Sequence, residues 1–584
     1  MSGLDTFGEI RSTIHRGSDD LLSAGLGLRG LAGLATAFVD PASPSAIELR
    51  RRAIQSAWKG MADLGPLGGF GSVYGRVPDV PGREYMAFAH LPGRRASHRV
   101  LLQVPDGFDH TRRCLVVTAS SGARGVYGGV ALAGGWGLPR GCAVAYTDKA
   151  CGSGYFDTAD QTGVALDGTR MARGDGTLEF DPGAGAVDVG IAVKHAHSGE
   201  HPEADWGRHV LQAVRFGLAM LDRAFPDEAP FTAANTCVIA TGLSNGGGAV
   251  LRAAGDDDEG ILSAVVAVEP NVYVKGHGRP LFDYATEAAL LLPAALASDA
   301  FDDLVFARAG RVTPPAWTLR CASLHAHGRL QDPYPRGQAA EARATLLAAG
   351  WTHEALAAGA ASTWLDLWRA VTVASASSAL RRPVHAMPCG FSYETAPFAR
   401  VPGTVDARTR AAWWADASGT PPGAGVVLAG GMDLSLDPLL PGQLRLRELW
   451  TGQGDDASML RSAVEETAVA LPRVGLPVVV VHGAADGLVP AAFSSAPYVK
   501  WLRAEGRAPV FWNVPHAQHF DAFLAFGGFG ERHVPLLPFG YAALDRVAEH
   551  LATGRALPED ALVRDTTPRG SGALTAGSLG HIEV

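Results

Sequence analysis

The sequence is poor in cysteine, in basic charge and in long apolar runs, and each shortage excludes a class of protein. Six cysteines among 584 residues are too few and too scattered for a disulfide scaffold, so we expect free thiols. A formal net charge of −9 provides no basic surface for nucleic acid or for an anionic membrane. We therefore expect neither a nucleic-acid partner nor a membrane partner.

The start of the chain also lacks the features of a targeting signal. No basic segment opens the sequence, and the first apolar stretch, residues 21–39, is interrupted by Arg29 and by several glycines. If the chain is complete, a cytoplasmic location is expected. If it is a trimmed mature form, a secreted or periplasmic location is the alternative.

Short apolar runs are abundant, and they lie on both sides of the segment 271–473. Runs of four to eight residues, nearly continuous in apolar character, are typical of parallel strands that are buried on both faces. They predict an α/β fold with a mostly parallel sheet flanked by helices. The runs lie at residues 100–104, 114–118, 142–146, 237–240, 263–270, 476–483 and 509–514.

The rhythm of strands and helices divides the chain into five parts. A chain of 584 residues exceeds a typical single core, so a large insertion or a second domain is expected. Between residues 271 and 473 the strand pattern stops, and the stretch is helical and rich in alanine. We predict a helical leader at 1–75, a core in two parts at 76–270 and 474–553, a mainly helical lid insertion at 271–473, and a disordered tail at 554–584.

The most informative motif is Gly-Leu-Ser-Asn-Gly at residues 242–246. An apolar run precedes it and a helical stretch follows, which is the setting of a nucleophile elbow. Small neighbours let strand and helix approach closely, so that the hydroxyl of Ser244 is exposed in a tight turn. The same turn aims the backbone N–H of Asn245 at the point where an oxyanion would form. A plain strand-to-helix turn is the structural alternative.

An acid and a base follow in the order Ser, Asp, His, which is the order of α/β-hydrolases. Asp486 lies just past the apolar run 476–483, where it can orient an imidazole; a structural turn is the alternative. The base must lie after the last strand, where His516 and His519 compete. We favour His519, because an apolar stretch begins directly after it.

Other candidate residues lie in one loop and in the insertion. Loop 119–125 follows a strand and can supply a second oxyanion donor, the N–H of Ser121, unless it is an ordinary glycine turn. Ser120, Gly122, Trp364 and Trp413 are candidate substrate-binding residues, although most tryptophans of the insertion are expected to fill its own core. The pair His195 and His197 has no further ligand cluster beside it, so we expect no metal and no cofactor.

Taken together, these blocks resemble the D-(−)-3-hydroxybutyrate oligomer hydrolases. The resemblance spans roughly residues 18 to 550, and it implies cleavage of ester bonds in a small-molecule oligoester, short oligomers of (R)-3-hydroxybutyrate. It also implies that Ser244 is the nucleophile, and it adds weight to His519. The blocks that carry it are residues 117–128, 136–149, 242–249 and 517–521.

Two other readings of the chain stay open at this point. One is another serine esterase on the same fold, of the tannase or feruloyl type, or a peptidase. The more distant one is a non-catalytic binding protein, which would be expected to have lost a member of the triad. Here all three candidate residues are present.

Overall fold

The computed structural model describes residues 6–183, 190–308, 312–396, 403–416, 419–421, 423–557, 560 and 563–581. At its centre lies a nine-stranded sheet in the order β1-β2-β3-β5-β4-β10-β11-β14-β15. The strands are β1 (Arg11–His15), β2 (Gly82–His90), β3 (Ser97–Pro105), β4 (Cys114–Ala119), β5 (Ala143–Thr147), β10 (Cys237–Leu243), β11 (Ala264–Val268), β14 (Val478–Gly483) and β15 (Val510–Val514).

The sheet is antiparallel at one edge and parallel through the rest. β1, β2, β3 and β5 pair antiparallel in turn, and from β5 to β15 every neighbouring pair is parallel. The strands β4, β5, β11 and β14 are buried along their whole length. This burial explains their continuous apolar sequences, and the predicted fold class is confirmed.

Helices cover both faces of this sheet. On one face lie α5 (Trp206–Ala224), α6 (Asn245–Asp256) and α15 (Ser495–Ala504), and on the other lie α2 (Ala46–Lys59) and α16 (Leu537–Thr553). The amphipathic α5 turns Val210, Val214 and Leu221 onto the sheet. No helix in the described ranges is both long and apolar enough to cross a membrane.

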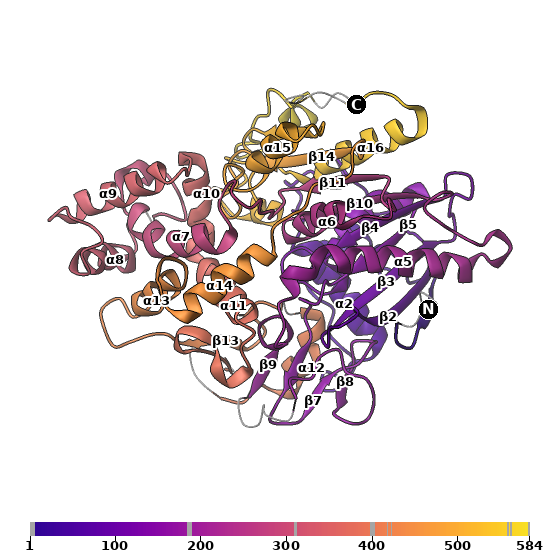
Figure 1. The fold of residues 1–584 in the computed structure, drawn as a ribbon, viewed down its shortest axis with the longest axis horizontal. Helices are drawn as coiled ribbons and strands as arrows, with labels where there is room; N and C mark the ends of the chain where they lie inside the picture. Colours follow the sequence, from indigo (N-terminus) through magenta and orange to yellow (C-terminus); the bar gives the residue numbers. More distant parts are fainter. Residues whose placement is uncertain are drawn as a thin grey trace.

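The segment 271–473 forms a helical body beside the sheet. Figure 1 shows its helices α7 to α10 on one side of the molecule and the large sheet on the other. A short antiparallel hairpin of β12 (Phe391–Thr395) and β13 (Val426–Gly430) belongs to the same segment. Its helices are α7 (Leu281–Ala295), α8 (Pro315–Ala326), α9 (Pro335–Ala348), α10 (His353–Trp364), α11 (Leu367–Ala379), α12 (Ala407–Asp416), α13 (Leu440–Thr451) and α14 (Asp455–Glu466).

Two regions differ from the sequence-based expectation. Residues 155–193, which carry no apolar run, contain a small sheet of β6 (Tyr155–Asp157), β7 (Thr162–Val164), β8 (Arg170–Ala172) and β9 (Ile191–Val193). The C-terminal tail is not a disordered extension in residues 563–581. Val563, Leu574 and Leu579 are buried against the main core, because single apolar side chains in a polar segment still find a place there.

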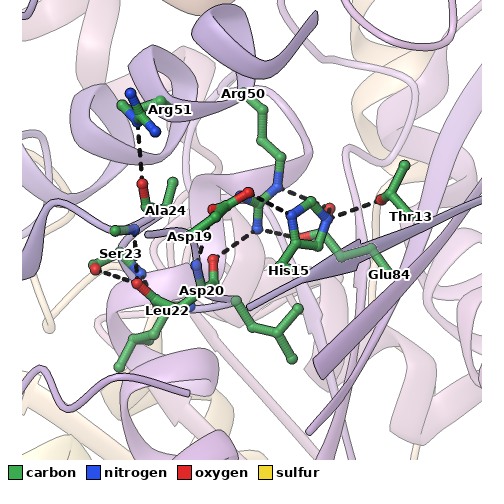
Figure 2. A network of polar contacts seen from close by, with 12 residues as sticks. Thr13, His15, Asp19, Asp20, Leu22, Ser23, Ala24, Arg50, Arg51 and Glu84 are labelled. Atoms are coloured by element: carbon green, nitrogen blue, oxygen red, sulfur yellow. Dashed lines mark hydrogen bonds and ion pairs between the residues drawn. The ribbon is translucent and has the colours of Figure 1, made fainter. Parts of the chain in front are cut away.

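A buried polar network fixes α2 to the edge of the sheet (Figure 2). Arg50 of α2 forms an ion pair with Glu84 of β2 at 2.8 Å and another with Asp19 at 2.9 Å. His15 at the end of β1 contacts Asp19 at 2.8 Å. Because each buried charge has a partner of opposite sign, the network joins three segments that are distant in sequence.

Candidate active site

Ser244 occupies a strained turn between β10 and α6. Its φ of 54° and ψ of −122° lie in a region that side chains rarely adopt. The neighbouring glycines permit the close packing: a Cβ at Gly242 would lie 2.4 Å from the backbone of Gly246, and one at Gly246 would lie 2.4 Å from the carbonyl oxygen of Ala119. The turn thus has the geometry of the predicted nucleophile elbow.

Three predicted residues that are far apart in sequence meet at this turn. His519 Nε2 lies 3.0 Å from Ser244 Oγ, and His519 Nδ1 lies 2.8 Å from Asp486 Oδ2. All three side chains are buried, with 7%, 6% and 1% of the surfaces of Ser244, His519 and Asp486 exposed. His516 lies elsewhere: its Nδ1 contacts Thr566 Oγ1 at 2.9 Å.

The carboxylate of Asp486 is held by several donors. The backbone N–H groups of Leu488 and Val489 donate to its Oδ1 at 2.8 and 2.7 Å. Burial alone would raise the pKa of this carboxyl, but the charge of His519 and hydrogen bonds from His482 and His519 lower the pKa below its usual value. Asp486 is therefore ionised at neutral pH and can orient the imidazole of His519.

Glu269 is a second carboxyl group at the same histidine, and the sequence did not single it out. It follows β11 directly, and its Oε2 lies 3.9 Å from His519 Nδ1. In the described part of the chain this oxygen has no hydrogen-bond partner. Burial, and then the negative charge of Asp486, raise the pKa of Glu269 well above its ordinary value. The sequence signal that could have indicated Glu269 is its position: it is a charged residue directly after an apolar strand.

The backbone around the serine offers donors for an oxyanion. The N–H of Asn245 opens α6 and so has no acceptor within the helix. The N–H of Ser121 donates to the carbonyl of Gly128 at 3.2 Å, whereas the N–H groups of Gly122 and Ala123 make no hydrogen bond within the described residues. The N–H of Gly122 or of Ala123 is therefore more available than that of Ser121 as the second donor to an oxyanion.

Lys149 forms hydrogen bonds with the loop 119–125, which carries these donors. Its Nζ donates to the carbonyl oxygens of Ser120 and Gly122 at 2.7 and 2.5 Å and to Ser120 Oγ at 3.0 Å. The side chain of Ser120 is therefore buried and engaged. The sequence analysis gave Lys149 no role, because its contact joins two different loops.

A cavity of about 480 Å³ opens onto Ser244, Asn245 and His519. Of the four predicted substrate-binding residues, Gly122 lines it. Ser120, Trp364 and Trp413 are not among its described lining residues. Trp413 is buried and donates to the carbonyl of Ala424, and Trp364 is 52% exposed beside Trp317, so both belong to the packing and surface of the insertion.

The apolar part of the cavity wall comes from several elements. Leu365 and Leu367 come from the ends of α10 and α11, Leu488 follows β14, and Leu536 and Leu537 open α16. The insertion and the core thus both contribute to the wall. Such a cavity suits a short aliphatic chain with a few polar groups.

The two histidines of the His-Ala-His motif have different partners. His195 Nε2 lies 2.6 Å from Glu203 Oε1, and the Nδ1 of His197 accepts a hydrogen bond from the N–H of Val193. Cys151 lies close to His195 and Glu203, so these three side chains form a buried cluster. His195 and Glu203 line a second, smaller cavity that shares Gly122 and Asn245 with the first.

The strand order and the turn at Ser244 define the fold as that of an α/β-hydrolase. A family model described as 3HB-oligomer hydrolase matches residues 4–584. The D-(−)-3-hydroxybutyrate oligomer hydrolase of Paracidovorax citrulli is 36% identical over 98% of this chain and 91% of the relative, and that of Burkholderia vietnamiensis is 37% identical over 99% and 92%. The chain belongs to the 3HB-oligomer hydrolase family.

Among solved structures, two esterases are similar at a lower level. Feruloyl esterase B from Aspergillus oryzae is 11% identical with a TM-score of 0.37, covering 89% of this chain and 88% of the other. Candida antarctica lipase A is 12% identical with a TM-score of 0.33, covering 75% and 73%.

Proposed function

We propose that this protein is a serine esterase that hydrolyses the ester bonds of (R)-3-hydroxybutyrate oligomers and releases 3-hydroxybutyrate, in the breakdown of polyhydroxybutyrate. The hydrogen-bonded series Asp486, His519 and Ser244 at the cavity carries the proposal of ester hydrolysis. Membership of the family supports the choice of substrate, because relatives at 36% and 37% identity bear the name of this activity.

In the proposed acylation step, Ser244 Oγ attacks the carbonyl carbon of the ester while His519 Nε2 takes its proton. The N–H of Asn245 and a second N–H from residues 121–123 stabilise the oxyanion of the tetrahedral intermediate. The intermediate collapses as His519 donates the proton to the ester oxygen. The hydroxy acid then leaves as an alcohol, and the acyl group stays on Ser244.

In the deacylation step, water takes the place of the alcohol. His519 accepts a proton from the water, whose oxygen attacks the acyl carbon, and the same proton returns to Ser244 Oγ as the acid leaves. Asp486 stays ionised throughout and stabilises the imidazolium, which agrees with its lowered pKa. Besides the substrate and water, these steps use side chains and backbone groups of this chain.

The test is release of 3-hydroxybutyrate from purified (R)-3-hydroxybutyrate dimer and trimer, with p-nitrophenyl butyrate and a feruloyl ester measured beside them. We expect monomer release from the wild type and its loss in Ser244→Ala, with an unchanged circular dichroism spectrum. Cleavage of the feruloyl ester but not of the oligomers would move the protein to the other esterase class.

The two neighbouring histidines provide a matched pair of variants. His519→Ala should lower kcat by about 10²–10⁴-fold, because it removes the proposed general base. His516→Ala should leave kcat within about threefold, since His516 contacts Thr566 and not Ser244. The opposite order of effects would assign the base to His516.

A further inference from the structure

Arg124 is a cation in the catalytic cavity without an acidic partner. It lies on the loop after β4 and lines the same cavity as Ser244 and His519. Its Nη2 donates to the carbonyl oxygen of Gly60 at 3.2 Å. Within the described ranges no carboxylate forms an ion pair with it, although a guanidinium offers five N–H donors.

Several buried arginines in the described ranges are paired with carboxylates, whereas buried Arg252 donates only to backbone carbonyl oxygens. Arg50 lies 2.8 Å from Glu84, Arg99 lies 2.5 Å from Glu179, and Arg320 lies 2.5 Å from Asp437. At Arg124, by contrast, burial lowers the pKa and no acidic side chain offsets the loss of hydration. Arg124 is half-buried and its guanidinium donates to Gly60, so an anion in the cavity would satisfy its remaining donors.

The chain makes room for this guanidinium at Gly60. Gly60 ends α2 with φ of −80° and ψ of −8°, a conformation that any residue adopts, so its backbone does not require glycine. A Cβ at this position would lie 2.2 Å from Nη1 of Arg124. The absence of a side chain at residue 60 therefore lets the guanidinium lie against the backbone at the end of α2.

The acidic residues that line the cavity are engaged elsewhere. Asp521 accepts hydrogen bonds from the N–H groups of Leu536 and Leu537, both at 2.8 Å, and burial raises its pKa to about 7. Glu269 lies beside His519, and burial raises its pKa well above the ordinary value. Neither forms an ion pair with Arg124 in the described structure.

We propose that Arg124 binds the free carboxylate at the end of the oligomer, so that the enzyme cleaves the ester bond next to that end. The inference rests on the proposed function. In a 3-hydroxybutyrate oligomer the terminal carboxylate carbon is three bonds from the last ester oxygen, so both groups fit in one cavity. The planar fork of an arginine matches the two oxygens of a carboxylate. The leaving group is then a single 3-hydroxybutyrate.

Binding of the terminal carboxylate by Arg124 would explain why the enzyme acts on short oligomers. A short oligomer offers one carboxylate for every few ester bonds, whereas a long polymer offers very few chain ends. An internal ester bond of the polymer has no charged group at the corresponding position, and binding it would leave the donors of Arg124 unused. The preference for short chains would thus arise at the leaving-group side of the cavity.

The test compares the dimer with its terminal carboxamide, which is neutral but has the same ester bond. We expect the wild type to cleave the carboxamide with a kcat/KM about 10–100-fold lower, because one charge-assisted contact is lost. Arg124→Met should lower kcat/KM for the dimer by a similar factor and leave that for the carboxamide and for p-nitrophenyl butyrate within about threefold. The preference for the carboxylate should therefore disappear.

A second variant covers the case in which Arg124→Met does not fold. Gly60→Ala keeps the arginine but displaces its guanidinium, so we expect a smaller loss confined to the dimer. Equal cleavage of dimer and carboxamide by the wild type, or equal losses on both in the variants, would overturn the role of Arg124 while leaving the esterase intact. If the wild type cleaves only p-nitrophenyl butyrate, the proposed function fails and this inference fails with it.

Discussion

Two carboxyl groups lie next to one histidine at the candidate active site, and their pKa values are shifted in opposite directions. The pKa of Asp486 is lowered by His519, and that of Glu269 is raised by burial and by Asp486. We predict that Glu269→Gln keeps kcat/KM within about threefold at pH 7, because glutamine has the size and the neutral charge of the protonated acid. Asp486→Asn should lower kcat by about 10⁴-fold, as loss of a triad acid does elsewhere.

The measurement is steady-state hydrolysis of p-nitrophenyl butyrate by both variants, with melting temperatures as a check on folding. If Glu269→Gln lost as much activity as Asp486→Asn, the acid that orients His519 would be Glu269. A double variant is also informative. Its activity should equal that of Asp486→Asn alone, unless Glu269 takes over the role of the missing carboxylate.

Among single residues, the sequence predicts those that belong to a short local motif. Ser244, Asp486 and His519 each follow a recognisable apolar strand, and the structure brings the three together. Arg124 was not identified, because its environment depends on Gly60, which is 64 positions away in the chain. Trp364 and Trp413 show the opposite error: aromatic enrichment indicated a binding surface, but it arises from packing within the insertion.

Helix α2 is attached to the sheet by buried charged side chains. Arg50 pairs with Glu84 and Asp19 beneath the helix (Figure 2). We predict that Arg50→Met lowers the free energy of unfolding by about 3–5 kcal/mol, because it leaves the carboxylate of Glu84 buried without its main partner. The next residue gives a matched control: Arg51 donates to the carbonyl of Ala24, and Arg51→Met should cost about 1 kcal/mol.

Urea unfolding of Arg50→Met and Arg51→Met would measure the two losses of unfolding free energy. Equal losses in the two variants would mean that the network contributes no more than an ordinary surface arginine. The same helix ends at Gly60, where the guanidinium of Arg124 lies, so Arg50→Met should also reduce the preference for the free carboxylate if that proposal holds.

At the level of elements, the apolar runs predicted the parallel strands, including the edge strand β15, and missed β1 and β2 at the antiparallel edge. The runs 114–118 and 476–483 are apolar throughout because both faces of β4 and β14 are covered. Strand β1 has the sequence Arg-Ser-Thr-Ile-His and is mostly exposed, so its residues give no apolar signal. The region 1–75 was predicted as a helical leader, and in the structure it contains both the helix α2 and the strand β1.

For the whole molecule, the polar network predicts how stability depends on acid. Burial would raise the pKa values of Asp19 and Glu84, but His15 and Arg50 lower both below the ordinary values of 3.8 and 4.5. A carboxyl group with a lowered pKa in the folded state contributes stability above its unfolded pKa and loses it as the pH falls. We predict a larger decrease in unfolding free energy between pH 5 and pH 3 for the wild type than for Glu84→Gln, measured by urea unfolding. Parallel curves for the two proteins would contradict the lowered pKa of Glu84.

The packing of the C-terminal segment could not be predicted from the sequence. Its composition is that of a flexible tail, yet Val563, Leu574 and Leu579 are buried in the main core, and Thr566 Oγ1 donates to the carbonyl of Pro515 at 2.8 Å. Thr566 also contacts His516, at the start of the loop that carries His519. Local composition does not reveal such contacts, because they depend on a complementary surface elsewhere in the fold.

We therefore predict that truncation after Thr553 lowers both stability and turnover. Each buried apolar side chain contributes about 1.5–3 kcal/mol, and part of this is offset by the entropy of ordering the segment, so a net loss of about 2–5 kcal/mol is expected in urea unfolding. Thr566→Val keeps the packing but removes both hydrogen bonds at the histidine loop, so it should lower kcat more than His516→Ala, which removes only the bond to His516, and cost about 1–3 kcal/mol of stability. A truncated protein with the wild-type unfolding free energy would show that the segment only lies on the surface. If truncation lowers kcat but Thr566→Val does not, the segment supports the core rather than the loop of His519.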